Sequence, residues 1–136
     1  MQFDGIYTPL VTPYNQDFSI NNRELLGVID FLIEVGVQGL IVAGTTGEYY
    51  AQSTQERLEL METVKKYIAE RVPLIVGTGA IRTEDSMIYA QAARDIGADA
   101  ILVATPPYAY PTDREIALHC LAVDRVANLP VMLYNY

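Results

Sequence analysis

The sequence predicts an α/β fold with a parallel sheet, and three observations lead to that prediction. Short apolar runs alternate with longer stretches of helical period along the whole chain. After the first run, these apolar runs show no polar alternation, which is typical of strands covered on both faces. Their starts lie about 26–35 residues apart, which leaves room for one helix between two strands. We therefore expect parallel neighbouring strands joined by right-handed crossovers.

The elements follow one another in a strict strand-helix order. In the first helix Leu25, Ile29 and Ile33 share one face, which is the pattern of a helix packed on a sheet. The strands are expected at residues 5–11, 39–43, 74–77, 100–104 and 131–135. Gly36 marks the end of the first helix, and capping-box spacing at Ser53 and Glu56 marks the start of the second. The third helix is expected over residues 83–96, before Gly97. The fourth begins with a second capping box at Thr112 and Glu115 and ends near Asn128.

Two architectures fit this order of elements. A doubly wound five-stranded sheet of the flavodoxin type fits the length of 136 residues. A (β/α)₈ barrel needs about 250 residues and would be cut after its fifth strand. The chain stops in strand-like sequence at residues 131–136, whereas a doubly wound domain normally closes with a helix. We therefore expect residues 1–136 to be the N-terminal part of a single barrel domain, with about five strands and four helices.

Composition excludes several classes of partner. The formal net charge of −8 and the scattered positive side chains argue against nucleic-acid binding. No apolar run approaches the roughly 18 residues of a membrane-spanning helix. The first residues lack the pattern of a signal peptide, so we expect a cytoplasmic protein. Cys120 is the only cysteine and His119 the only histidine, and they are adjacent on a predicted helix, so we expect neither a metal site nor a nucleophile there. We also expect no cofactor.

Hydroxyl groups dominate the expected carboxyl ends of the strands, where parallel α/β folds carry their sites. The most informative stretch is GTTG at residues 44–47, between a strand and a helical region. Its amides and two hydroxyls could hold an anion such as a carboxylate, and it could equally be a tight turn without a ligand. The GTG at residues 77–79 lacks the third glycine of a dinucleotide loop, because position 82 is arginine.

Five stretches in chain order carry a family resemblance. They are residues 5–13 (GIYTPLVTP), 44–48 (GTTGE), 77–79 (GTG), 105–108 (TPPY) and 133–136 (LYNY). In these motifs the chain resembles the N-terminal half of the dihydrodipicolinate synthase / N-acetylneuraminate lyase family. The resemblance implies a (β/α)₈ barrel of the class I aldolase type, which forms a Schiff base with pyruvate or a related 2-keto acid.

The same resemblance implies roles for individual residues. Thr45, Thr46 and Gly47 would bind the substrate carboxylate, and Thr45 would also pass protons. Tyr134 would be the acid/base beside the imine. Tyr108 would complete the proton relay from a neighbouring subunit, because family members are usually homotetramers built from dimers. Homo-oligomers, dimers or tetramers, are therefore expected, with Tyr110 at the tight interface.

The Schiff-base lysine of the family stands on the sixth strand, beyond Tyr136. Lys65 and Lys66 are the only lysines of this chain, and both fall in the second predicted helix, outside a barrel. The chain alone is therefore expected to be inactive. Because its first and last strands would have open edges, we expect it to associate through those edges, to swap elements with a copy of itself, or to occur only as part of a longer protein.

Three functions stay open at this point. A lyase like dihydrodipicolinate synthase is the first, and a 2-keto-3-deoxy sugar acid aldolase or dehydratase, or an enzyme like N-acetylneuraminate lyase, is the second. The third is a non-catalytic doubly wound domain that binds a small anion.

Overall fold

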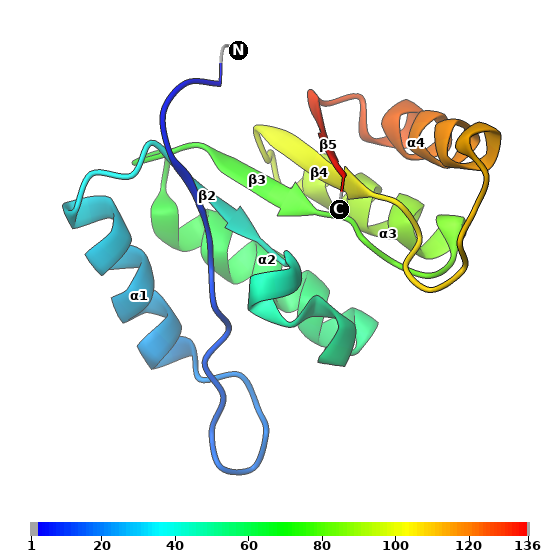
Figure 1. Ribbon diagram of the computed structural model, residues 1–136. Coiled ribbons are helices and arrows are strands. Elements are labelled where there is room, and N and C mark those ends of the chain that lie inside the picture. The colour runs from blue at the N-terminus through cyan, green and yellow to red at the C-terminus, as the bar shows by residue number, and fades with distance from the viewer. Residues whose placement is uncertain (1–2, 136) are drawn as a thin grey trace.

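The computed structural model describes residues 3–135 and shows parallel strands that alternate with helices (Figure 1). The strands are β1 (Tyr7–Pro9), β2 (Gly39–Val42), β3 (Leu74–Gly77), β4 (Ala100–Ala104) and β5 (Val131–Tyr134). The helices are α1 (Asn22–Glu34), α2 (Thr54–Ile68), α3 (Thr83–Asp95) and α4 (Asp113–Ala127). Two short 3₁₀ turns, η1 (Thr45–Gly47) and η2 (Tyr49–Ala51), lie between β2 and α2. The predicted element order is confirmed, although β1 is shorter than residues 5–11, and Tyr136 of the LYNY motif lies outside the described residues.

Strand order decides between the two architectures. The sheet runs β1-β2-β3-β4-β5 in space, and every neighbouring pair is parallel. Successive right-handed crossovers that always step in one direction place all helices on one face, as Figure 1 shows. A doubly wound sheet reverses its strand order and carries helices on both faces. The doubly wound reading is therefore wrong, and the curled half-barrel is confirmed.

The main core lies between the convex face of the sheet and the helices. Leu40, Leu74 and Ile101 point to this face and are completely buried there. Helix α1 adds Leu25 and Ile29 from the apolar stripe that its sequence predicts. Because alternate residues of a strand face opposite sides, the intervening positions must line the concave side.

The concave face carries a second, smaller apolar cluster. Ile41, Ile75 and Ala100 form it, and Leu102 and Met132 pack against it while partly exposed. The register places Ile41 beside Ile75 and Ile75 beside Ala100, so one layer of side chains crosses three strands. This is the geometry of a barrel interior, in which inward side chains stack in layers.

Capping boxes begin two of the helices, as predicted. At α2 the Ser53 hydroxyl accepts a hydrogen bond from the Glu56 amide at 3.3 Å, and the Glu56 carboxylate accepts one from the Ser53 amide at 2.8 Å. At α4 the Thr112 hydroxyl accepts a hydrogen bond from the Glu115 amide at 3.4 Å, and the Glu115 carboxylate accepts one from the Thr112 amide at 2.8 Å. These bonds satisfy amides that the first helical turn leaves without partners.

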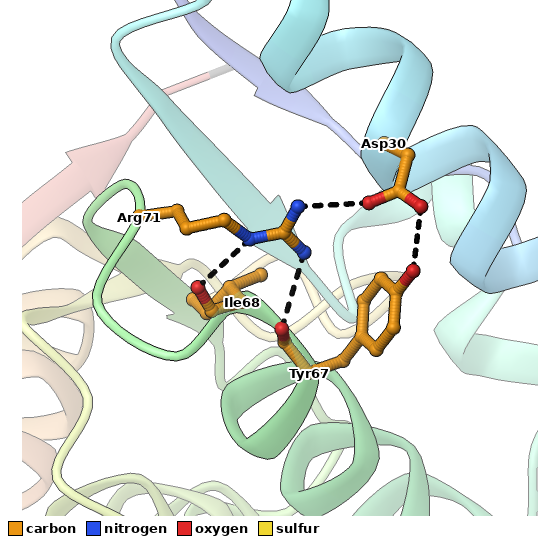
Figure 2. Close-up of polar contacts among 4 residues, drawn as sticks. All are labelled: Asp30, Tyr67, Ile68 and Arg71. Carbon is orange, nitrogen blue, oxygen red and sulfur yellow. Dashed lines mark hydrogen bonds and ion pairs between the residues drawn. The ribbon is translucent and has the colours of Figure 1, made fainter.

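Near the amino ends of the strands lies a group of polar contacts between helices, which we call the Arg71 cluster (Arg71, Asp30, Tyr67 and Ile68; Figure 2). Asp30 of α1 accepts hydrogen bonds from Arg71 Nη1 at 2.8 Å and from the Tyr67 hydroxyl at 2.5 Å. Arg71 also donates to the carbonyls of Ile68 at 3.2 Å and Tyr67 at 3.1 Å. The cluster therefore joins α1 to the end of α2.

The outer strands β1 and β5 form the edges of the sheet among residues 3–135. Apolar side chains beside them stay in water, because Ile6 and Leu133 are each 67% exposed. The prediction that both outer strands have an open edge is confirmed, while the association of those edges stays a prediction. Within the same residues, no helix is both long and apolar enough to cross a bilayer.

Candidate active site

A cleft of about 340 Å³ opens where the strands end at their carboxyl termini, beside the concave face. It is largely apolar, and none of the residues within 3–135 that line it carries a charged side chain. The side chains and turns that shape it include Thr45, Tyr49, Tyr50, Gly77, Gly79 and Tyr134. They come from the ends of three strands that are distant in sequence, which is how barrel enzymes build their sites.

The turn η1 forms the polar part of the rim. Its internal hydrogen bonds run from the Gly47 amide to the Gly44 carbonyl at 3.1 Å and from the Glu48 amide to the Thr45 carbonyl at 3.0 Å. The amides of Thr45 and Thr46 precede these bonds and have no partner among residues 3–135, and both threonines are exposed. Two amides and two hydroxyls at one turn suit an anion such as a carboxylate.

The turn η1 is held from below by Thr12, which belongs to the GIYTPLVTP motif, and by Gln52, which the sequence did not single out. The Gly47 carbonyl accepts hydrogen bonds from the buried Thr12 hydroxyl at 2.7 Å and from Gln52 Nε2 at 2.9 Å. Gln52 also donates to the Tyr14 hydroxyl at 3.1 Å. A Cβ at Gly47 would lie 2.9 Å from the Leu10 carbonyl oxygen, so a side chain has no room there. The position of η1 is therefore set by its supports.

The end of β3 approaches the end of β2 without space for a side chain. A Cβ at Gly77 would overlap the carbonyl oxygen of Ala43. Ala43 itself adopts a positive φ of 56°, a conformation that costs a residue with a side chain some energy. The first glycine of GTG is therefore required by close packing of two backbones at the cleft floor.

Arg57 of α2 is a buried cation behind the cleft wall. It is 2% exposed, and its Nη1 and Nη2 donate to the carbonyls of Gly79 and Gly77, each at 2.7 Å. Its guanidinium carbon lies 3.8 Å from the ring centre of Tyr89 and 4.7 Å from that of Tyr49. Burial lowers the pKa of Arg57 to about 10, so the side chain stays charged at neutral pH.

The role of Arg57 was not predicted from the sequence, although one signal marks this residue. Arg57 stands on the same stripe of α2 as Leu60, Met61 and Val64, which are all buried. A charged residue on a core-facing stripe is unusual, because a buried charge needs polar partners. That spacing could have identified a buried arginine. It could not have identified its partners, because the carbonyls that it binds lie beyond α2, at the end of β3.

The structure brings some predicted site residues together and separates others. Thr45 and Tyr134 line the same cleft, and Tyr134 is 42% exposed at the end of β5. Thr46 and Gly47 are next to Thr45 on η1 but do not line the cleft. Tyr108 is 94% exposed with a positive φ of 70° and does not line the cleft within this chain.

Two groups with possible reactivity lie away from the cleft. His119 is buried, and its Nδ1 lies 2.9 Å from the Thr83 hydroxyl, which links α4 to α3. Burial lowers the pKa of His119, while a bond with the Ala104 backbone opposes that shift. Lys65 forms an ion pair with Glu70 at 2.8 Å and lies 3.9 Å from Asp99, at the amino ends of β3 and β4. Neither side chain lines the cleft, although His119 contacts the backbone of Ala104, which does.

Comparisons with known proteins extend over the whole fold. The 4-hydroxy-tetrahydrodipicolinate synthase of Bacillus subtilis (strain 168) is 38% identical over 135 residues, which cover 99% of this chain and 47% of that protein. YagE, a prophage protein of the dihydrodipicolinic acid synthase family from Escherichia coli K12 in complex with pyruvate, matches with a TM-score of 0.96 and 31% identity. That match covers 100% of this chain and 46% of YagE.

A third match is CdNal from Clostridium difficile in complex with mannosamine, with a TM-score of 0.95 and 29% identity over 98% of this chain and 47% of CdNal. The chain thus spans about half the length of the relatives it matches. The model of the Dihydrodipicolinate synthetase family matches residues 2–136. The half-barrel, its rim motifs and these matches agree, and the chain belongs to the dihydrodipicolinate synthetase family.

Proposed function

We propose that this chain is the N-terminal part, residues 1–136, of a longer single-barrel protein that acts as a Schiff-base lyase. Its substrate is pyruvate or a related 2-keto acid, and its activity is most like that of 4-hydroxy-tetrahydrodipicolinate synthase. The observation that carries the proposal is the cleft shared by Thr45 and Tyr134, with unpaired amides on the adjoining turn. The name of the Bacillus subtilis relative and the pyruvate complex of YagE support it.

In this proposal η1 binds the carboxylate of the keto acid. The amides and hydroxyls of Thr45 and Thr46 donate to the carboxylate oxygens, and Gly47 lets the backbone approach. The keto carbon then lies inward, over the neutral cleft floor. Neutral donors thus orient the acid without an ion pair on the turn itself.

Tyr134 carries the proton transfer. A lysine amine attacks the keto carbon, and the carbinolamine loses its hydroxyl as water when a proton is delivered. The Tyr134 phenol at the end of β5 can give that proton and recover it through the Thr45 hydroxyl. Tyr108 would relay protons from a neighbouring subunit, because its own chain leaves it in solvent. The protein would be a cytoplasmic dimer or tetramer, with Tyr110 in the tight interface.

The attacking lysine must come from outside this chain. Lys65 is held by Glu70 at the opposite end of the sheet, and Lys66 is exposed on the same helix. Neither side chain can reach a keto acid bound at η1.

Borohydride trapping with pyruvate, followed by mass spectrometry, tests this proposal. In the longer protein we expect one adduct on a lysine beyond residue 136, and in the 136-residue chain no adduct. Thr45→Val should weaken trapping at limiting pyruvate, while the control Thr63→Val on α2 should not. An adduct on Lys65 or Lys66 would overturn the assignment.

A second candidate function is cleavage or dehydration of a 2-keto-3-deoxy sugar acid, or a reaction like that of N-acetylneuraminate lyase. The match to CdNal, whose structure holds mannosamine, favours keeping it. Both candidates share the keto-acid half of the site. Assays of the longer protein with pyruvate plus an aldehyde, and with sugar acids, separate them by the ratio of their kcat/KM values.

A further inference from the structure

The cleft has neutral walls, yet a full positive charge lies directly behind them. No lining residue is charged, and Arg57 does not itself line the cleft. Arg57 contacts three residues that do, namely Tyr49 through its ring and Gly77 and Gly79 through their carbonyls. Among residues 3–135 no carboxylate forms an ion pair with it. Its charge is therefore offset by dipoles and ring faces alone.

We propose that Arg57 is a positioning residue with two effects: it fixes the wall formed by Tyr49, Gly77 and Gly79, and it supplies the positive potential that draws a carboxylate to η1. The inference rests on the proposed function, because it concerns the same cleft and the same keto acid.

The positioning effect follows from the shape of the guanidinium. Its two terminal nitrogens reach two carbonyls of one turn at equal distances of 2.7 Å. A planar fork can hold both carbonyls at once, whereas a lysine ammonium on a flexible stem has no such fork. Tyr89 and Tyr49 cover the guanidinium at 3.8 and 4.7 Å. The turn after β3 and the aromatic wall from η2 are thus locked to one side chain.

The electrostatic effect follows from burial. A charge removed from water is screened less by solvent and salt than one on the surface. The carbonyls and rings around Arg57 leave its net charge of +1 in place. An anion that enters the cleft is therefore attracted, although η1 offers only neutral donors.

Kinetics of the longer protein with pyruvate test both effects. Arg57→Gln removes the charge, and Arg57→Lys keeps it without the fork. We expect Arg57→Gln to raise KM for pyruvate by about tenfold, the size of one partly screened charge interaction. Arg57→Lys should keep KM within about threefold of wild type while both variants lose kcat, because the wall is no longer locked. Counting active sites by borohydride trapping corrects kcat for unfolded protein.

The matched controls are Arg71→Gln and Arg71→Lys. Arg71 also binds two carbonyls and covers a tyrosine ring, but it lies at the other end of the strands. Both control variants should leave KM and kcat within about twofold of wild type, since only the cleft end carries the reaction.

The outcomes separate the two proposals. Wild-type protein that forms no imine with pyruvate overturns the proposed function, and this inference with it. If wild type forms the imine but both Arg57 variants keep the wild-type KM and kcat per active site, only the inference is wrong. Should Arg57→Gln fail to fold, Arg57→Lys decides, because an unchanged kcat overturns the positioning role and a reduced kcat at unchanged KM supports it.

Discussion

Two arginines at opposite ends of the sheet make similar bonds in different surroundings. Arg71 donates to two backbone carbonyls and lies 5.0 Å from the ring centre of Tyr67 (Figure 2). Arg57 also donates to two backbone carbonyls and lies over the rings of two tyrosines. Arg71 has Asp30 as an ion-pair partner and a side chain that is 40% exposed. Arg57 is buried without a carboxylate.

The different surroundings of the two arginines match the different roles of the two ends of the half-barrel. Exposed ion pairs at the amino ends of the strands add little stability and can be replaced. A buried cation without an ionic partner costs desolvation energy, so its position must be stabilised by many contacts at once. In a barrel fold the amino ends of the strands serve stability and the carboxyl ends carry the chemistry. The predictions below test that division.

The largest expected effect comes from Arg57→Ala. Two buried carbonyls would lose their donors and the space of a large side chain would empty, so we expect a loss of about 3–5 kcal/mol in the free energy of unfolding. Urea unfolding followed by circular dichroism measures this loss. Arg71→Ala in the same experiment should lose much less, because an exposed ion pair adds little stability. Equal losses in the two variants would break the comparison.

A smaller effect is expected for Gly77→Ala. The added methyl group would meet the Ala43 carbonyl, so β2 and β3 must separate at the cleft, at a cost of about 1–3 kcal/mol. Gly27→Ala is the matched control, because nothing lies within 4 Å of a Cβ at that position of α1. It should stabilise the protein by about 0.5–1 kcal/mol. Thermal unfolding of both variants gives the signs, and a stabilising Gly77→Ala would contradict the close approach.

Asp30→Asn should lower stability only slightly at neutral pH, because its ion pair with Arg71 is exposed. The amide oxygen can still accept one hydrogen bond in place of the carboxylate, but the attraction to Arg71 is lost. Urea midpoints in low and high salt measure this effect, because salt screens an exposed pair. If salt changes the urea midpoint of wild type no more than that of Asp30→Asn, the ion pair contributes nothing to stability.

The smallest effect is a pH dependence at the amino end. Hydrogen bonds from Tyr67, and then from Arg71, lower the pKa of Asp30 below its usual range. The stability from this lowered pKa is therefore present above the unfolded value of about 4 and is lost as pH falls through the folded value. Unfolding free energies measured from pH 6 down to pH 3 should fall less steeply for Asp30→Asn than for wild type. Parallel curves would contradict the assignment.

Local signals carried much of the fold. The capping pairs at Ser53 and Thr112 were readable because an N-cap acts only on residues within one turn. The GTTGE turn was readable as an anion-binding candidate because its glycines let backbone amides approach a ligand beside two hydroxyls, although a tight turn without a ligand fitted the same residues. The cleft shared by Thr45 and Tyr134 followed from the expectation that parallel strands end on one rim.

By itself the sequence determined the alternation of strands and helices, their approximate ends and the hydroxyl-rich rim, because these depend on neighbours along the chain. Only the tertiary structure decided that the sheet runs in simple order with helices on one face, since strand order depends on contacts between distant segments. It also decided that Arg57 meets Gly77 and Gly79, and that Gly77 must lack a side chain. Those requirements arise only when α2 and the ends of β2 and β3 are packed together, and packing is not encoded in any single stretch of the chain.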